Sequence, residues 1–162
     1  MTASDPDIQI DPARVLATDA DLQDQLERLL QRASVRQVWL LFLDGDLRLA
    51  EPLMPNDEVP DSPHELCDTE DLGTVPFAEV LVDRARMASE MIGAREFVLV
   101  WERCGADRFS AEDRAWAHAA AAEAGPRWGR GASFGGETPV PLRAQFVLHD
   151  TGLRQITADD YA

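Results

Sequence analysis

One unbroken apolar run constrains the fold of this chain more than any other feature. Residues 97–101 read Phe-Val-Leu-Val-Trp and are apolar at every position, whereas a half-buried strand alternates apolar and polar residues. A strand that is apolar on both faces belongs in the interior of a sheet. We therefore predict a strand over residues 96–101 and place it in the centre of the sheet.

The residues after this strand predict a turn and then a helix. Gly105 supplies the turn, and Ser110 and Asp113 stand three residues apart before an alanine-rich segment that ends at Gly125. Serine followed by an acid at this spacing is typical of a capping box, in which each side chain bonds the backbone N–H of the other residue. The sequence therefore predicts a helix that begins after Ser110.

Hydrophobic periodicity and turn residues predict the remaining elements. Leucines recur at helical spacing after a threonine cap, and a second amphipathic segment ends at a glycine. Asp-Gly and Asp-Thr-Gly turns each join two apolar or alternating segments, as in β-hairpins. The predicted elements are helices over 19–33 and 77–92, a hairpin that turns at Asp44-Gly45, and a terminal hairpin that turns at Asp150-Thr151-Gly152.

These elements predict one α/β domain of the α+β kind over residues 1–162. Its mixed sheet would have about three helices packed on it and a terminal β-hairpin, and a chain of 162 residues suits a single domain. The middle of the chain is rich in prolines and acids, which resist regular packing. Three segments are therefore predicted to be irregular: a loose N-terminus over 1–17, a long acidic loop over 51–76 with five prolines and eight acids, and a glycine-rich loop over 126–141.

The charge of the chain favours some partners and excludes others. The formal net charge is −15, and all fifteen basic residues are arginine. Such a chain repels the phosphates of nucleic acid, and the lack of lysine excludes Schiff-base chemistry and a P-loop. The charge instead favours a basic protein partner. We predict that the acidic loop contacts it through Asp57, Glu58 and Asp61.

The apolar segments and the cysteines predict a cytoplasmic protein that does not enter a membrane. The longest apolar run has the length of a strand, far short of the roughly 20 residues that span a bilayer. The acidic start of the chain does not fit a signal peptide. Cys67 and Cys104 are too few for a disulfide framework, so reduced thiols are expected.

The end of the central strand is the candidate site. A strand, a turn and a helix N-terminus gather backbone N–H groups and a favourable dipole at one place. The alternative interpretation is that the capping residues only satisfy the helix. Trp116 is expected to wall the space, whereas His149 is expected to be a single packed or exposed histidine without a catalytic role. The candidate pocket residues are Trp101, Glu102, Cys104, Gly105, Ser110 and Asp113.

The spacing of Gly105, Ser110 and Asp113, with the order of elements over about three quarters of the chain, resembles the RadC-like branch of the JAB/JAMM (MPN) metalloprotein fold. In that family two strand histidines and the aspartate of an S-x-x-D motif bind zinc, and an upstream glutamate is the acid/base. Aligned without gaps, the histidine positions fall on Val100 and Glu102. Because a catalytic zinc site needs three protein ligands and valine supplies none, the resemblance implies a metal-free member. No cofactor is predicted from the sequence.

The favoured function is therefore a non-catalytic protein-binding or regulatory module, and the sequence identifies no catalytic residue. One alternative is a hydrolase that uses Glu102, Asp113 and a distant His64 around a metal, or Cys104 as a thiol nucleophile. His64 and Cys67 would supply half of a metal site, but no second pair stands at metal-site spacing. A further alternative is an obligate homodimer in which the edge strand of a terminal hairpin pairs with its twin.

Overall fold

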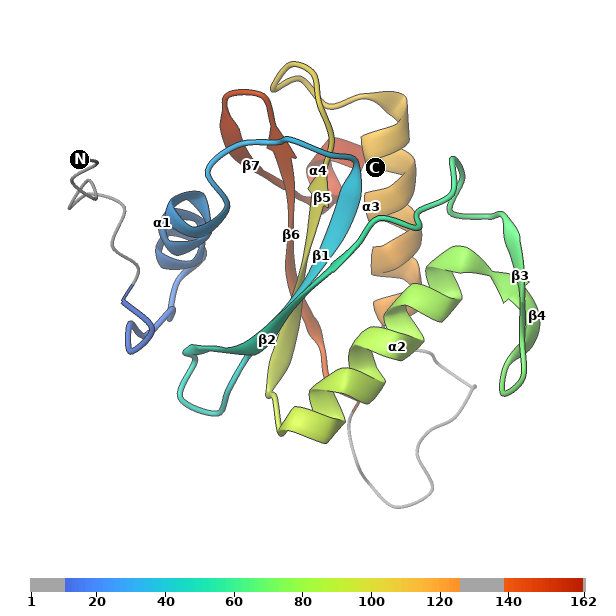
Figure 1. Ribbon diagram of the computed structural model, residues 1–162, viewed down its shortest axis with the longest axis horizontal. Coiled ribbons are helices and arrows are strands. Elements are labelled where there is room, and N and C mark those ends of the chain that lie inside the picture. The colour runs from blue at the N-terminus through green and yellow to red at the C-terminus, as the bar shows by residue number, and fades with distance from the viewer. Residues whose placement is uncertain (1–10, 126–138, 162) are drawn as a thin grey trace, which may run out of the picture.

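A five-stranded mixed sheet forms the middle layer of the protein (Figure 1). The structure, a computed structural model, describes residues 11–125 and 139–161. The strand order is β2-β1-β5-β6-β7, with β5 and β6 parallel and the other neighbours antiparallel. The strands are β1 (Gln37–Leu43), β2 (Leu49–Asn56), β5 (Glu96–Glu102), β6 (Leu142–His149) and β7 (Gly152–Ile156).

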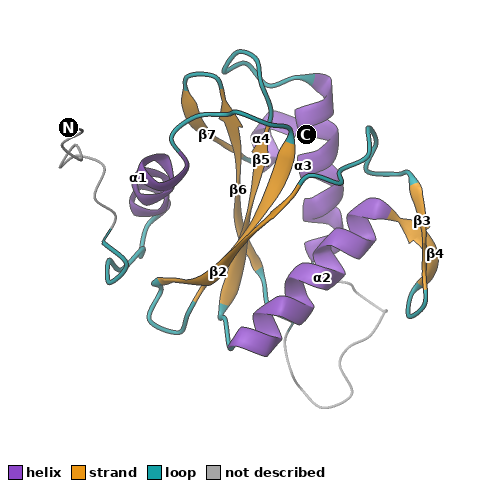
Figure 2. Ribbon diagram, viewed as in Figure 1, coloured by secondary structure: helices purple, strands orange, loops and turns teal. Residues whose placement is uncertain are grey.

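Helices cover both faces of this sheet (Figure 2). One face carries α1, and the other carries α2 and α3, with the short α4 against α3. The described part of the chain contains no helix with the length and apolarity that a membrane crossing requires. The helices are α1 (Asp19–Leu30), α2 (Phe77–Ile92), α3 (Ala111–Ala124) and α4 (Ala158–Tyr161). The predicted single α/β domain with a mixed sheet is thus confirmed.

The central position of β5 is also confirmed. Leu99 lies opposite Leu40 of β1, and Val100 lies opposite Phe146 of β6. Successive side chains of a strand point to opposite faces, so β5 contributes to two separate cores. Leu99 packs in the core under α2 and α3, whereas Val100 packs in the core under α1. The unbroken apolar run is therefore needed because both faces of β5 are buried.

The capping residues and the helix-ending glycine identified in the sequence lie at helix ends in the structure. Thr18 and Asp21 form a capping box at the start of α1, and Ser110 and Asp113 form one at the start of α3. Gly93 ends α2 in the left-handed conformation, with φ of 72°, which a glycine adopts without steric cost. Only α1 differs from its prediction, because it ends at Leu30 and not at residue 33.

The prediction of a long loop over 51–76 is wrong. β2 continues to Asn56, and β3 (Leu66–Thr69) and β4 (Gly73–Pro76) form a separate two-stranded sheet. The prolines of β2 are tolerated because β2 is an edge strand, where a missing N–H removes no bond to a second neighbour. The β3–β4 turn is held by the Thr69 hydroxyl, which donates to the Gly73 carbonyl at 2.8 Å. The irregular part is therefore confined to residues 57–65.

The prediction of a loose N-terminus over 1–17 is wrong for its last residues. Leu16 is fully buried in the core under α1, and its N–H donates to the Leu47 carbonyl at 2.8 Å. Arg14 pairs with Asp24 of α1 at 2.5 Å. Residues 1–10, and residues 126–138 of the predicted glycine-rich loop, lie outside the described residues.

The outer strands of both hairpins, β2 and β7, are the edges of the main sheet. This is the arrangement that the homodimer alternative assumes. Pro52 and Pro55 lack an N–H, so β2 presents an incomplete row of donors to a second strand. The structure thus favours β7 over β2 for such pairing, and the homodimer stays a prediction.

We predict that Leu16→Ala lowers the free energy of unfolding by about 2–4 kcal/mol, because it removes a fully buried side chain from the core under α1. Chemical denaturation followed by tryptophan fluorescence measures this change. The matched control is Val15→Ala at a neighbouring side chain that is 46% exposed, which should change the value by about 0.5 kcal/mol or less. Equal effects of the two substitutions would show that residue 16 is not anchored.

Candidate functional site

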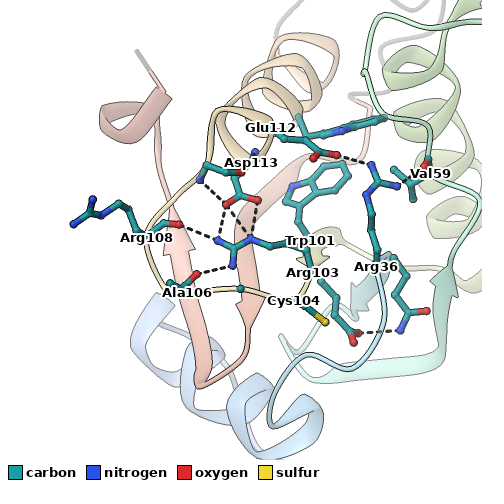
Figure 3. Close-up of a pocket in the computed structure, with 14 residues that line it drawn as sticks. Arg36, Val59, Trp101, Arg103, Cys104, Ala106, Arg108, Glu112 and Asp113 are labelled. Atoms are coloured by element: carbon teal, nitrogen blue, oxygen red, sulfur yellow. Dashed lines mark hydrogen bonds and ion pairs between the residues drawn. The ribbon is translucent and has the colours of Figure 1, made fainter.

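A cavity of about 530 Å³ opens at the C-terminal end of β5 (Figure 3). Its walls come from the start of β1, the segment after β2, the β5–α3 turn and the start of α3. Cavities that bind small molecules usually measure roughly 300–1,000 Å³. The six residues that the sequence singles out all line this one cavity: Trp101, Glu102, Cys104, Gly105, Ser110 and Asp113.

Two buried indoles form one wall of the cavity. The ring centroids of Trp101 and Trp116 lie 5.2 Å apart, and Phe77 meets Trp116 edge-on at 5.7 Å. The Trp101 N–H donates to Gln145 at 2.8 Å, and the Gln145 amide donates to the Ala117 carbonyl at 2.9 Å. These contacts fix the Trp101 ring between the sheet and α3. This wall is therefore rigid and largely apolar.

Asp113 is held by an ion pair and by the helix cap. Arg103 donates to its carboxylate from Nε, at 3.2 Å to each oxygen, and from Nη2 at 2.8 Å, and the Ser110 N–H donates at 2.9 Å. Asp113 is 5% exposed. Arg103 also donates to the carbonyls of Ala106 and Arg108 at 2.5 and 3.0 Å (Figure 3). The pair therefore fixes the β5–α3 turn, and Asp113 has a structural role.

Glu102 faces the opposite side of the sheet from Asp113 and is buried there. Its carboxylate accepts from the N–H groups of Ser34 and Val35 at 2.7 and 3.0 Å. The Gln37 amide and the Trp39 indole donate to its other oxygen at 2.9 and 2.8 Å. Burial alone would raise the pKa of Glu102, but these hydrogen bonds outweigh burial and lower the pKa. Glu102 is therefore an ionised anchor for the segment between α1 and β1.

The geometry does not assemble a metal site. Val100 and Glu102, which the resemblance aligns with histidines, both face α1, whereas Asp113 lies on α3. In residues 11–125 and 139–161, no three His, Cys, Asp or Glu side chains are placed to hold a metal ion. The metal-assisted alternative, through Glu102, Asp113 and a distant His64, therefore has no support from the donor set.

Cys104 is exposed and lines the cavity. A thiol nucleophile is normally activated by a neighbouring base. None of the described residues that line the cavity is a histidine, and the Arg103 guanidinium is turned toward Asp113 (Figure 3). The thiol-hydrolase alternative therefore lacks its base among the described residues.

Arg36 attaches the acidic segment, which we define as residues 57–61, to the rim of the cavity. It donates to the carbonyls of Val59 and Pro60 and pairs with Glu112 of α3 at 2.6 Å. Val59 lines the cavity as a result. Sequence reasoning missed Arg36, because an arginine before a strand carries no local signal that a distant segment will bind it.

We predict that Glu102→Gln lowers the free energy of unfolding by about 2 kcal/mol or more, because the neutral amide leaves buried donors without an acceptor. The control is Asp71→Asn in the β3–β4 turn, where the carboxylate pairs with Arg84 at 2.9 Å and both side chains are exposed. Its loss should cost much less. Denaturant titration measures both, and equal losses would contradict the anchoring role of Glu102.

The lowered pKa of Glu102 also predicts a pH dependence of stability. Its folded pKa lies below the ordinary value of 4.5, so its contribution is present above pH 4.5 and is lost as the pH falls through the folded pKa. The wild-type protein should therefore lose stability more steeply below pH 4.5 than Glu102→Gln. Unfolding free energies measured across this range test the point, and parallel curves would refute it.

No family model, no curated protein and no solved structure matches this chain. The RadC-like resemblance therefore stays a prediction that rests on Gly105, Ser110, Asp113 and the order of the elements. The chemistry of the cavity follows from the contacts of its own residues. In those contacts the two candidate acids, Glu102 and Asp113, stabilise the fold. The cavity therefore keeps an apolar wall beside the acidic segment.

Proposed function

We propose that this protein is a non-catalytic binding module that recognises a basic protein partner at the β5-end cavity and the acidic segment beside it. The observation that carries the proposal is the Arg36 contact. By bonding Val59, Pro60 and Glu112 together, Arg36 makes the acidic segment and the cavity parts of one surface. A partner that reached one would also meet the other.

The occupied carboxylates support a role without catalysis. A general acid or base needs a carboxyl group that can reach the substrate. Asp113 accepts four hydrogen bonds from Arg103 and Ser110, and the Glu102 carboxylate binds the segment between α1 and β1. Both acids therefore stabilise the walls of the cavity.

The charge of the rim supports a basic partner. Asp57, Glu58 and Asp61 are exposed, and their carboxylates make no hydrogen bond or ion pair within the described part of the chain. With a net charge of −15, the protein attracts a cationic surface and speeds its approach. This attraction weakens in salt, because exposed charges are screened over about 8–10 Å.

The cavity itself suits an apolar side chain or the stem of an arginine or lysine. Arg36 and Arg103 already donate to carbonyls and carboxylates of the protein. The surfaces that remain for a ligand include the indole wall, Val59 and Cys104. Long cationic side chains bury their stems on apolar surface and keep the charge outside, where the acidic segment lies.

The first step of the test is to identify the protein that binds this surface. Crosslinking in the source cells followed by mass spectrometry identifies it, and calorimetry with the purified partner measures the affinity. We expect Asp57→Asn/Glu58→Gln/Asp61→Asn to weaken binding at least tenfold and to reduce its salt dependence. The control, Glu51→Gln/Glu90→Gln/Asp159→Asn, removes equal charge at exposed positions outside the cavity and should change the affinity far less. A partner with an acidic contact face, or equal effects of the two triple variants, would overturn the proposal.

A second substitution tests the cavity. Cys104 is exposed, so Cys104→Trp would fill the cavity from its open side and leave the melting temperature unchanged. We expect it to abolish binding of the partner, whereas the conservative Cys104→Ser should retain it. Full binding by Cys104→Trp would show that the cavity takes no part.

A further inference from the structure

A second cavity, of about 400 Å³, lies at the turn between β6 and β7. Its walls come from the C-terminal end of α1, the β5–α3 turn and the β6–β7 turn. No described residue lines both this cavity and the one at the end of β5. Polar and charged side chains dominate it, among them Glu27, Asp107, His149, Thr151 and Arg154.

His149 is the buried polar group of this cavity. It is 5% exposed, and its Nδ1 lies 3.3 Å from the Thr151 amide nitrogen and 3.2 Å from the Thr151 hydroxyl. A backbone N–H can only donate, so Nδ1 accepts and the neutral ring carries its proton on Nε2. Burial, and then the charge of Arg103, lower the pKa of His149, which favours this neutral ring.

The Nε2–H donor of His149 has no partner within the described part of the chain. The one side-chain nitrogen or oxygen there that is both fully enclosed and unpartnered is Nε1 of Trp116. His149 Nε2 is therefore open to the cavity that the ring lines. A donor held this way binds an acceptor at low cost, because most of its hydration is already lost.

Arg154 supplies a second donor on the same side. It pairs with Val147 across the hairpin while His149 pairs with Gly152, so both side chains project from the same face of the sheet. Its guanidinium lies 4.3 Å from the Phe109 ring centroid and donates from Nη1 to the Asp107 carbonyl at 3.2 Å. Nε and Nη2 have no partner among the described residues. His149 and Arg154 thus suit a carboxylate.

Asp107 supplies a negative charge on the same side. It lines the cavity in the turn whose carbonyl binds Arg154, and its charge opposes the lowering of the His149 pKa. The Asp107 carboxylate has no partner in the described part of the chain, so it suits an ammonium group. Glu27 and Gln31 bring the C-terminal end of α1 to the cavity from the other face of the sheet.

We propose that the cavity at the β6–β7 turn binds a free α-amino acid, with its carboxylate on His149 Nε2–H and Arg154 and its ammonium toward Asp107. The volume fits, since small-molecule sites begin at roughly 300 Å³. This site is independent of the proposed protein-binding surface. Its ligand would be a small molecule that carries one carboxylate and one ammonium group.

The direct test is thermal melting and calorimetry of the full chain with each of the standard amino acids at about 10 mM, enough to detect millimolar affinity. We expect at least one amino acid to raise the melting temperature. The analogues of that ligand that lack either the amino or the carboxyl group should bind at least tenfold more weakly. Failure of every amino acid, or equal affinity for either analogue, would overturn the proposal.

Substitutions locate the binding. Arg154→Gln and Asp107→Asn change exposed side chains and should each weaken binding of the amino acid at least tenfold without unfolding the protein, which melting without ligand checks. The matched controls, Arg95→Gln and Glu90→Gln, change exposed charges that do not line the cavity and should leave the affinity unchanged. Undiminished affinity of both Arg154→Gln and Asp107→Asn would place the ligand elsewhere and refute the site.

Discussion

The hydrogen bonds around the Glu102 carboxylate determine how the layers of this protein meet. A buried charge is costly unless several donors surround it, and here Ser34, Val35 and Gln37 are among the donors. Ser34 and Val35 come from the segment that joins α1 to β1, and Gln37 is the first residue of β1, so the bonds tie α1 to the end of β5. The next residue, Arg103, points to the other face and ties β5 to α3. Two neighbouring charges thus connect the central strand to both helical layers.

Much of the fold could be predicted because its signals are local. The apolar run of β5, the capping residues Ser110 and Asp113 and the stop at Gly93 depend on a few adjacent residues. The β3–β4 sheet and the anchoring of Leu16 could not be predicted, because they depend on contacts with distant segments. The prolines of β2 misled the prediction for a related reason: proline opposes an interior strand but not an edge strand, and edge position is a property of the whole sheet.

In the candidate site, too, features that depend on adjacent residues could be predicted, and features that depend on distant segments could not. Its six predicted residues line one cavity because they lie within one strand, one turn and one helix start. Their roles were harder to predict. Alternation along β5 sends Glu102 away from Asp113, and the partners that occupy Glu102 are more than sixty residues earlier in the chain. Arg36 and His149 gain their importance from side chains that only the fold brings near them, so neither could be predicted from its neighbours.

The β5–α3 turn separates the two cavities. Arg103 and Cys104 line one of them, and Asp107 lines the other. The bonds from Arg103 to the carbonyls of Ala106 and Arg108 hold both sides of this partition at once. A ligand that moved the partition would change the shape of both cavities, so binding events on its two sides would be thermodynamically linked. Such linkage is reciprocal: each ligand would change the affinity for the other by the same factor.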